Sequence, residues 1–136
     1  MTEPGQPQFF RLFTHAEATA LLPALRPRLR HLAAMKRQLD VVQGEFDGIQ
    51  DHARVNGHAR RAQELEAELH TLLHDLNAEI AAITALGVAV KDLTVGLVDF
   101  PSARDGRTVY LCWRMDEPTI TAWHELDGGY MGRQLL

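Results

Sequence analysis

The side chains best suited to chemistry lie in the last third of this 136-residue sequence, where Asp99, Cys112 and His124 supply a carboxylate, a thiol and an imidazole. These three groups are the donor types of a three-ligand zinc site, and they are also the residue types of a cysteine nucleophile with its base. The sequence therefore raises two chemical hypotheses, a divalent metal such as zinc and a reactive thiol. The alternative without chemistry is a buried Cys112 that packs as a small apolar side chain.

His124 is followed by Glu125, which adds a fourth candidate metal ligand. The pair resembles the start of the H-E-x-x-H zinc motif, but the second histidine is missing because position 128 is Gly128. Neighbouring side chains on a strand point to opposite faces, so His124 and Glu125 could bind one ion only across a bulge. The metal hypothesis therefore centres on His124 with Asp99, Cys112 or Glu125.

Aromatic and charged side chains interleave with these positions and could form a surface for a ligand or a protein partner. The candidates for that surface are Asp99, Tyr110, Trp113, Arg114, Trp123 and Arg133. Gly128, Gly129 and Gly132 beside Arg133 could also wrap an anion through backbone N–H groups. The alternative is that these glycines only allow the chain to turn and bind nothing.

The elements that must position these residues are strands. Beyond Gly87 the apolar pattern alternates, and we expect strands at 88–91, 95–100, 108–113 and 119–124, which are rich in β-branched and aromatic residues. Turns at 101–106 and 115–118 would join them into a meander. Residues 127–136 contain three glycines and no period, so we expect an irregular tail there.

The strand register decides whether Cys112 and His124 share a face of the sheet. One register pairs Arg114 with Thr119. It places His124 on the apolar face with Trp113, and Cys112 on the opposite face. A slip of one residue puts His124 on the same face as Cys112. The sequence leaves both registers open.

Two long helices precede the strands. Apolar residues recur every three or four positions over 22–49 and again over 65–86, which is the spacing of one helical stripe. A polar stretch separates the two stripes, and we expect the chain to reverse near residue 54. The pattern therefore predicts an antiparallel helical hairpin over about 14–87.

The ends of the two helices carry recognisable signals. Thr14 and Glu17 have the spacing of a capping box that starts the first helix, and Gly87 follows the second stripe as a helix-ending glycine. Pro23 and Pro27 each lack a backbone N–H and crowd the preceding turn. We expect them to kink the first helix or to divide it.

Together these patterns predict an α+β fold, in which a long antiparallel helical hairpin is followed by a small antiparallel β-meander sheet. We expect a flexible lead-in at residues 1–8 and a single domain over 9–136, with the hairpin over about 14–87, the sheet region over about 88–126 and the tail over 127–136. So small a sheet covers only part of two long apolar stripes. We therefore expect a homodimer that pairs two hairpins into a four-helix bundle.

Composition limits the partners and the compartment. The net charge of -4 gives no overall attraction to phosphate backbones, which argues against nucleic acid as a partner. No apolar run approaches the roughly 18 to 20 residues that span a bilayer, so we expect no membrane segment. A single cysteine and an N-terminus without a basic segment followed by an apolar core favour a cytoplasmic protein.

Two stretches of the strand region carry a family resemblance. The segments KDLTVGLVDFPSARDGRTVYLCWR and EPTITAWHELDGGYMGR resemble the signature half of an uncharacterised bacterial family, domain of unknown function 2203, and FTHAEATALLPALRP is similar to that family's start. The family has no assigned activity. The resemblance therefore implies a bacterial, intracellular, single-domain protein and transfers no catalytic residue.

On these grounds we expect a non-enzymatic, oligomeric binding or scaffolding protein that uses the aromatic and charged surface of the sheet. The alternative is a metal-binding protein or metalloenzyme centred on His124 with Asp99, Cys112 or Glu125. A third class is catalysis by the Cys112 thiol. Bound metal that is lost on His124→Ala separates the second class from the other two.

Overall fold

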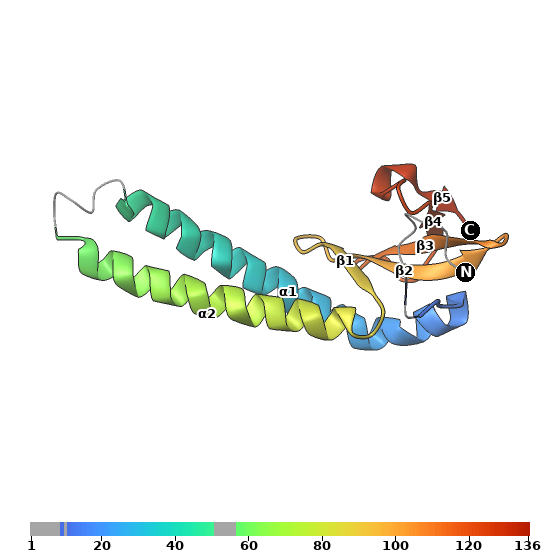
Figure 1. Cartoon of the computed structure of the whole chain (residues 1–136), viewed down its shortest axis with the longest axis horizontal. Coiled ribbons are helices and arrows are strands. Elements are labelled where there is room, and N and C mark those ends of the chain that lie inside the picture. Colours follow the sequence, from blue (N-terminus) through green and yellow to red (C-terminus); the bar gives the residue numbers. More distant parts are fainter. Residues whose placement is uncertain (1–8, 10, 51–56) are drawn as a thin grey trace.

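The computed structural model describes residues 9, 11–50 and 57–136. Two long helices, α1 (His15–Gln50) and α2 (Ala59–Thr84), lie side by side and precede a five-stranded sheet (Figure 1). The strands are β1 (Ala89–Asp92), β2 (Leu97–Arg104), β3 (Arg107–Arg114), β4 (Ala122–His124) and β5 (Gln134–Leu135). They follow one another in the sheet in chain order, and each neighbouring pair is antiparallel. The predicted α+β fold, a helical hairpin followed by a β-meander, is confirmed.

The predicted helix signals operate at both ends of the hairpin. The Thr14 hydroxyl accepts a hydrogen bond from the Glu17 N–H at 3.1 Å, and the Glu17 carboxylate accepts one from the Thr14 N–H at 2.9 Å. After α2, Gly87 has a φ of 95°, a left-handed conformation that glycine adopts without steric strain. The capping box and the helix-ending glycine are therefore confirmed.

Of the two outcomes expected at Pro23 and Pro27, a kink or a division of the first helix, the division is wrong, because α1 continues through both prolines. A proline inside a helix destabilises it by about 3 kcal/mol. The apolar face of the same turns supplies the compensation, since Leu22, Leu25 and Leu29 are buried in the core. Fully burying three such side chains contributes about 1.5 to 3 kcal/mol each, which is enough to hold the helix intact.

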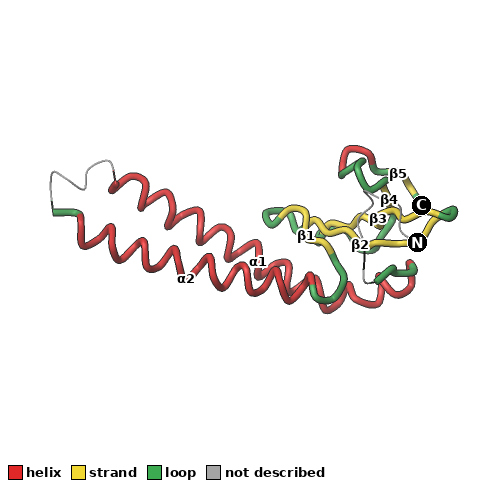
Figure 2. The backbone as a smooth tube through the Cα atoms, viewed as in Figure 1, coloured by secondary structure: helices red, strands yellow, loops and turns green. Residues whose placement is uncertain are grey.

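The hairpin extends well beyond the sheet, and only the part nearest the sheet packs against it (Figure 2). Along the shared seam Val42, Leu65 and Leu76 are buried. Two ion pairs also join the helices, Arg28 with Glu79 at 3.0 Å and Arg61 with Glu45 at 2.8 Å. The reversal predicted near residue 54 and the lead-in predicted for residues 1–8 lie outside the described residues.

Three predictions about the strand region are wrong. The strand expected at 119–124 begins only at Ala122, because residues 115–121 form the connection between β3 and β4. Residues 101–104 belong to β2 rather than to a turn, and Asp105 and Gly106 alone make the reversal, with φ values of 51° and 77°. Two central residues of positive φ are what a tight hairpin requires, because they match the twist of the flanking strands. The tail is not irregular throughout, since residues 130–132 form a short 3-10 helix and β5 pairs with β4. A two-residue strand is too short to leave an alternating pattern in the sequence.

The two faces of the sheet differ in character. One face packs on α1 and forms the main core with Phe13, Leu22, Leu25, Leu29, Val98, Phe100, Val109, Leu111 and Trp113. The opposite face carries the polar side chains Asp99, Cys112 and His124, which are also buried. The sheet therefore separates an apolar core from a buried polar cluster.

Candidate functional site

The strand register brings the three candidate ligands onto one face. Tyr110 lies opposite His124, and Cys112 lies opposite both Ala122 on one side and Asp99 on the other. The register that pairs Arg114 with Thr119 is wrong, and the register slipped by one residue is the one observed. The slip places Leu111 opposite Trp123 on the helix-facing side, where both side chains are buried. Burial of Trp123 in the core is therefore the physical reason that His124 faces Cys112.

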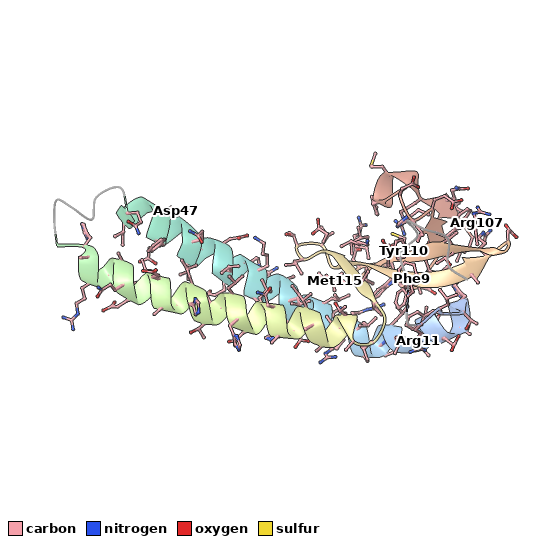
Figure 3. All side chains as sticks on the ribbon, in the orientation of Figure 1. Phe9, Arg11, Asp47, Arg107, Tyr110 and Met115 are labelled. Carbon is pink, nitrogen blue, oxygen red and sulfur yellow. The ribbon has the colours of Figure 1, made fainter. Side chains whose placement is uncertain are left out.

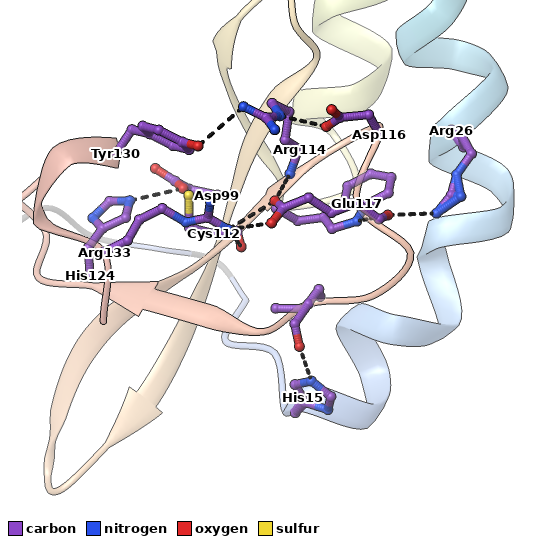
Figure 4. Close-up of polar contacts among 12 residues, drawn as sticks. His15, Arg26, Asp99, Cys112, Arg114, Asp116, Glu117, His124, Tyr130 and Arg133 are labelled. Carbon is purple, nitrogen blue, oxygen red and sulfur yellow. Dashed lines mark hydrogen bonds and ion pairs between the residues drawn. The ribbon is translucent and has the colours of Figure 1, made fainter. Parts of the chain in front are cut away.

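Asp99, Cys112 and His124, hereafter the polar cluster, lie close together and away from solvent. Their exposed fractions are 2%, 0% and 2%. His124 Nε2 lies 3.0 Å from Asp99 Oδ1, and the Cys112 thiol lies near the same carboxyl group (Figure 4). One donor atom from each side chain lies within 4.8 Å of the other two. The described part of the chain thus assembles one carboxylate, one thiol and one imidazole at a single point.

The orientation of the His124 ring follows from its second contact. Nδ1 lies 2.6 Å from the backbone oxygen of Glu125. A carbonyl oxygen can only accept, so Nδ1 carries the hydrogen and donates it. The same oxygen also accepts the N–H of Gly128 at 3.0 Å. In the neutral ring, Nε2 therefore presents its lone pair to Asp99 and Cys112.

This arrangement leaves a gap in the hydrogen bonding between His124 and Asp99. The neutral ring offers an acceptor at Nε2, and an ionised carboxylate offers only acceptors. Two acceptors 3.0 Å apart repel each other unless a hydrogen or a cation lies between them. In a buried place this repulsion is not screened by water. The polar cluster must therefore hold either a proton or a positive ion.

Burial governs the acidity of the two acidic members. Loss of solvent raises the pKa of the Asp99 carboxyl above its ordinary value, and the nearby His124 ring only partly opposes this. Burial, with the charge of Asp99 added to it, raises the pKa of the Cys112 thiol to about 12. The thiol is thus protonated at neutral pH, which argues against Cys112 as a nucleophile because the thiolate is the reactive form.

Glu125 contributes its backbone and not its carboxylate. Its side chain is 41% exposed and forms an ion pair with Arg107 at the surface. Glu125 follows the last residue of β4, and both of its carboxylate oxygens accept hydrogen bonds from Arg107 on β3. The carboxylate of Glu125 therefore lies outside the polar cluster, while the Glu125 carbonyl orients the His124 ring.

The remaining sequence candidates divide between the two faces. Trp113 and Trp123 are buried on the helix-facing side, away from the polar cluster. Tyr110 lies beside His124, with ring centroids 5.5 Å apart, and Phe9 packs edge-on against Tyr110 (Figure 3). Arg114 and Arg133 both approach the Tyr130 ring. Of the predicted ligand surface, Tyr110 and Arg133 are thus next to the polar cluster.

Sequence reasoning missed Glu117, which lies in the turn before β4 and joins three elements. Its carboxylate accepts two hydrogen bonds of 2.9 Å from Arg133 and one of 2.8 Å from the Arg114 N–H. Its backbone oxygen accepts from Trp113 Nε1 at 3.0 Å and from Arg26 at 3.2 Å. A glutamate in a polar turn gives no sequence signal, because its partners are distant in the chain.

Fold and site together define an α+β protein with a buried Asp, Cys and His cluster on the face of its sheet that points away from the helices. Residues 11–136 match the family described as "Uncharacterized conserved protein (DUF2203)", so the chain belongs to this family. No curated protein and no solved structure is detectably similar to it. No helix within the described residues is both long enough and apolar enough to cross a bilayer.

Proposed function

We propose that this protein binds a divalent metal of the zinc class through Asp99, Cys112 and His124. The observation that carries the proposal is the pair of facing acceptors, His124 Nε2 and Asp99 Oδ1, buried 3.0 Å apart beside a thiol. A divalent cation between them converts the repulsion into two coordinate bonds. The thiol then becomes a third ligand by losing its proton.

The donor set and its spacing fit such an ion. Tetrahedral zinc with ligand bonds of about 2.0 to 2.3 Å needs donors roughly 3.3 to 3.8 Å apart. The 3.0 Å pair of His124 and Asp99 must therefore open slightly, and separations of up to 4.8 Å must close by about 1 Å. A mixture of sulfur, nitrogen and oxygen donors favours zinc over magnesium or calcium. Two anionic ligands also match the charge of the ion.

The surroundings of His124 support the same proposal. Histidine ligands of metals donate their second ring N–H to a carbonyl or carboxylate, which fixes the ring and raises its basicity. His124 makes this bond to the Glu125 carbonyl. Three protein ligands leave a fourth position for water or a substrate, as in catalytic zinc sites, so metalloenzyme activity is the extension of this proposal.

A cysteine ligand also bears on the compartment. The Cys112 thiol must stay reduced to bind metal, which the cytosol favours. We therefore propose a cytoplasmic location in a bacterium, in agreement with the absence of a partner cysteine in the sequence.

The test is elemental analysis of protein purified without an affinity tag or chelator. We expect about one equivalent of metal per chain, and a loss of at least 90% of it in His124→Ala. The matched control is His70→Ala, because His70 is an exposed histidine on α2 and should keep its metal. Circular dichroism confirms that each variant folds. A folded wild-type protein that holds no metal after incubation with zinc contradicts the proposal.

The second candidate function is an oligomeric binding or scaffolding protein that pairs two helical hairpins. The supporting observation is that seam residues of the hairpin remain half-buried, and that Val41 and Leu73 are 66% and 47% exposed. The half-buried members of the seam are Met35, Leu39, Phe46, Ile49, Leu69 and Leu72. A second hairpin would cover them in a four-helix bundle.

Sedimentation tests this candidate independently of metal. We expect a dimer at micromolar concentration, and a shift toward monomer when Leu73→Glu adds a charge to the exposed part of the seam. Thr71→Glu is the control, because Thr71 lies two residues from Leu73 on the exposed polar side of α2. This variant should leave the mass unchanged. A wild-type monomer contradicts the dimer and leaves the metal site unaffected.

A further inference from the structure

Residues 125–133, hereafter the cover, fold over the polar cluster. The segment leaves β4 at the end of the strand that carries His124, and returns to the sheet as β5. Its short 3-10 helix lies on the side of the sheet opposite α1 (Figure 1). Met131 is 94% exposed and Tyr130 is 39% exposed, whereas Cys112 beneath is fully buried. The cover thus lies against the polar cluster, with Gly128 beside His124 and Arg133 beside Cys112.

The end of the cover is fastened to the rest of the protein by an ion pair that is largely shielded from solvent. Arg133 Nη2 lies 2.9 Å from both carboxylate oxygens of Glu117, and only 17% and 19% of the two side chains is exposed. The same guanidinium lies 3.4 Å from the backbone oxygen of Cys112. The Tyr130 ring covers it at 4.8 Å. Glu117 is itself anchored to β3 by the Arg114 N–H, so the pair ties the cover to the strand that bears the cysteine.

The start of the cover is also linked to the candidate ligand His124. The Glu125 oxygen accepts from His124 Nδ1 and from the Gly128 N–H, which closes the first turn of the cover. A Cβ atom at position 128 would lie 3.6 Å from the His124 Cβ, so this turn packs directly on the histidine. Unfolding the turn would therefore remove the hydrogen bond that orients the imidazole.

We propose that the cover is a gate for the polar cluster, with the Arg133–Glu117 ion pair as its latch, so that opening of residues 125–133 controls the entry and release of metal. This inference rests on the proposed metal site and specifies how the site is regulated. Opening exposes the donors and frees the His124 ring in one step. Closing restores the ring hydrogen bond and excludes water from the ion.

The experiment compares Glu117→Gln and Arg133→Gln with the wild-type protein. In the first measurement, zinc-loaded protein is mixed with a chromogenic chelator, and the rate of zinc release is followed. We expect both variants to release zinc at least tenfold faster than wild type. Glu45→Gln is the matched control, because it breaks an exposed ion pair with Arg61 between the two helices, away from the cover and the polar cluster. It should change the rate less than twofold.

The second measurement uses metal-free protein and follows alkylation of Cys112 by iodoacetamide. The same order of rates is expected, with the two latch variants at least tenfold faster than wild type and Glu45→Gln unchanged. This measurement does not need a metal, so it tests whether the cover opens even if the protein binds no metal. Alkylation rates of the latch variants equal to that of Glu45→Gln overturn the inference.

Opening of the cover must also be distinguished from unfolding of the whole protein. Val42→Ala weakens the hairpin core far from the cover and serves as a variant of matched overall stability. We expect it to leave Cys112 alkylation within twofold of wild type in the absence of denaturant. An increase as large as that of Glu117→Gln would mean that the cysteine is reached only through global unfolding, and would overturn the inference.

Discussion

Nε2 of His124 lies 3.0 Å from Oδ1 of Asp99, and both side chains are almost completely buried. The other ring nitrogen already donates its hydrogen to the Glu125 carbonyl. A neutral ring beside an ionised carboxylate would therefore place two acceptors face to face. The pair is stable only with a proton or a cation between its members, and this requirement sets the chemistry of the site.

Asp99→Asn should abolish metal binding, and it should make the metal-free protein more stable than metal-free wild type. The asparagine amide can donate to His124 Nε2, and its oxygen can still accept from the Cys112 thiol, so the hydrogen bonding is satisfied without a buried charge. We expect a gain of about 1 kcal/mol in the free energy of unfolding at pH 7. Chemical denaturation of the metal-free proteins measures it.

The stability difference between Asp99→Asn and wild type should depend on pH, which checks the explanation for this variant. Because burial raises the pKa of Asp99 in the folded state, the wild-type carboxyl favours folding at low pH and loses that advantage as the pH rises through its folded-state pKa. The advantage of the asparagine should therefore shrink below about pH 4, where aspartate is protonated in both states. Asp116→Asn at the surface should change stability by less than about 0.5 kcal/mol. A destabilised Asp99→Asn protein would contradict this reading of the pair.

Cys112 should react slowly with alkylating reagents in the native protein. With a thiol pKa of about 12, the thiolate fraction at pH 8 is about a thousandfold lower than in an unfolded chain with an ordinary thiol pKa. Alkylation of native and urea-unfolded protein measures the ratio. A native thiol that reacts as fast as the unfolded one would restore the nucleophile hypothesis.

The same shift predicts a loss of stability in alkaline solution. The thiol pKa is raised on folding, so its contribution to stability is complete below the pKa of the unfolded thiol, near 9, and is lost as the pH rises toward about 12. Cys112→Ala should flatten the stability profile over this range. A profile that keeps the same slope after the substitution would show that another group causes the alkaline loss.

Metal binding should release protons. The Cys112 thiol is protonated at neutral pH and must ionise to bind, so at least one proton leaves for each ion bound. The apparent affinity should therefore rise about tenfold per pH unit near neutrality. Calorimetry in buffers of different ionisation enthalpy counts the protons. Binding that releases none would mean that the thiol is not a ligand.

Substitutions of Gly96 and Gly106 test how closely the Met115 side chain packs on Gly96. Both have positive φ, at 69° and 77°, so an alanine at either position is strained by about 1 to 2 kcal/mol. At Gly96 a Cβ would also lie 2.5 Å from the Met115 sulfur, whereas at Gly106 it meets open space. We expect Gly96→Ala to be the more destabilising by about 1 kcal/mol in chemical denaturation. Equal losses would mean that Met115 moves aside freely.

The helices and the order of the strands were predictable because their signals are local. The capping box of Thr14 and Glu17, the apolar stripes and Gly87 each act within a few residues of chain. The continuity of α1 through Pro23 was not predictable in the same way. It depends on burial of Leu25 and Leu29 against a sheet that lies far away in the sequence.

The site was predictable in composition but not in geometry. Asp99, Cys112 and His124 could be named from their chemistry, yet a slip of one residue between β3 and β4 decides whether they meet. The slip follows from burial of Trp123, which is a property of the packed core. Glu117 and the cover could not be predicted, because the Arg133–Glu117 contact depends on how a glycine-rich tail folds.

Cobalt(II) titration of the metal-free protein, followed by absorption spectroscopy, tests the central claim most directly. We expect saturation at one equivalent, with the visible bands of a tetrahedral site and a sulfur-to-cobalt charge-transfer band that disappears in Cys112→Ser. Zinc should displace the cobalt. A spectrum that stays that of hydrated cobalt, or a charge-transfer band that survives in Cys112→Ser, would contradict a metal site formed by Asp99, Cys112 and His124.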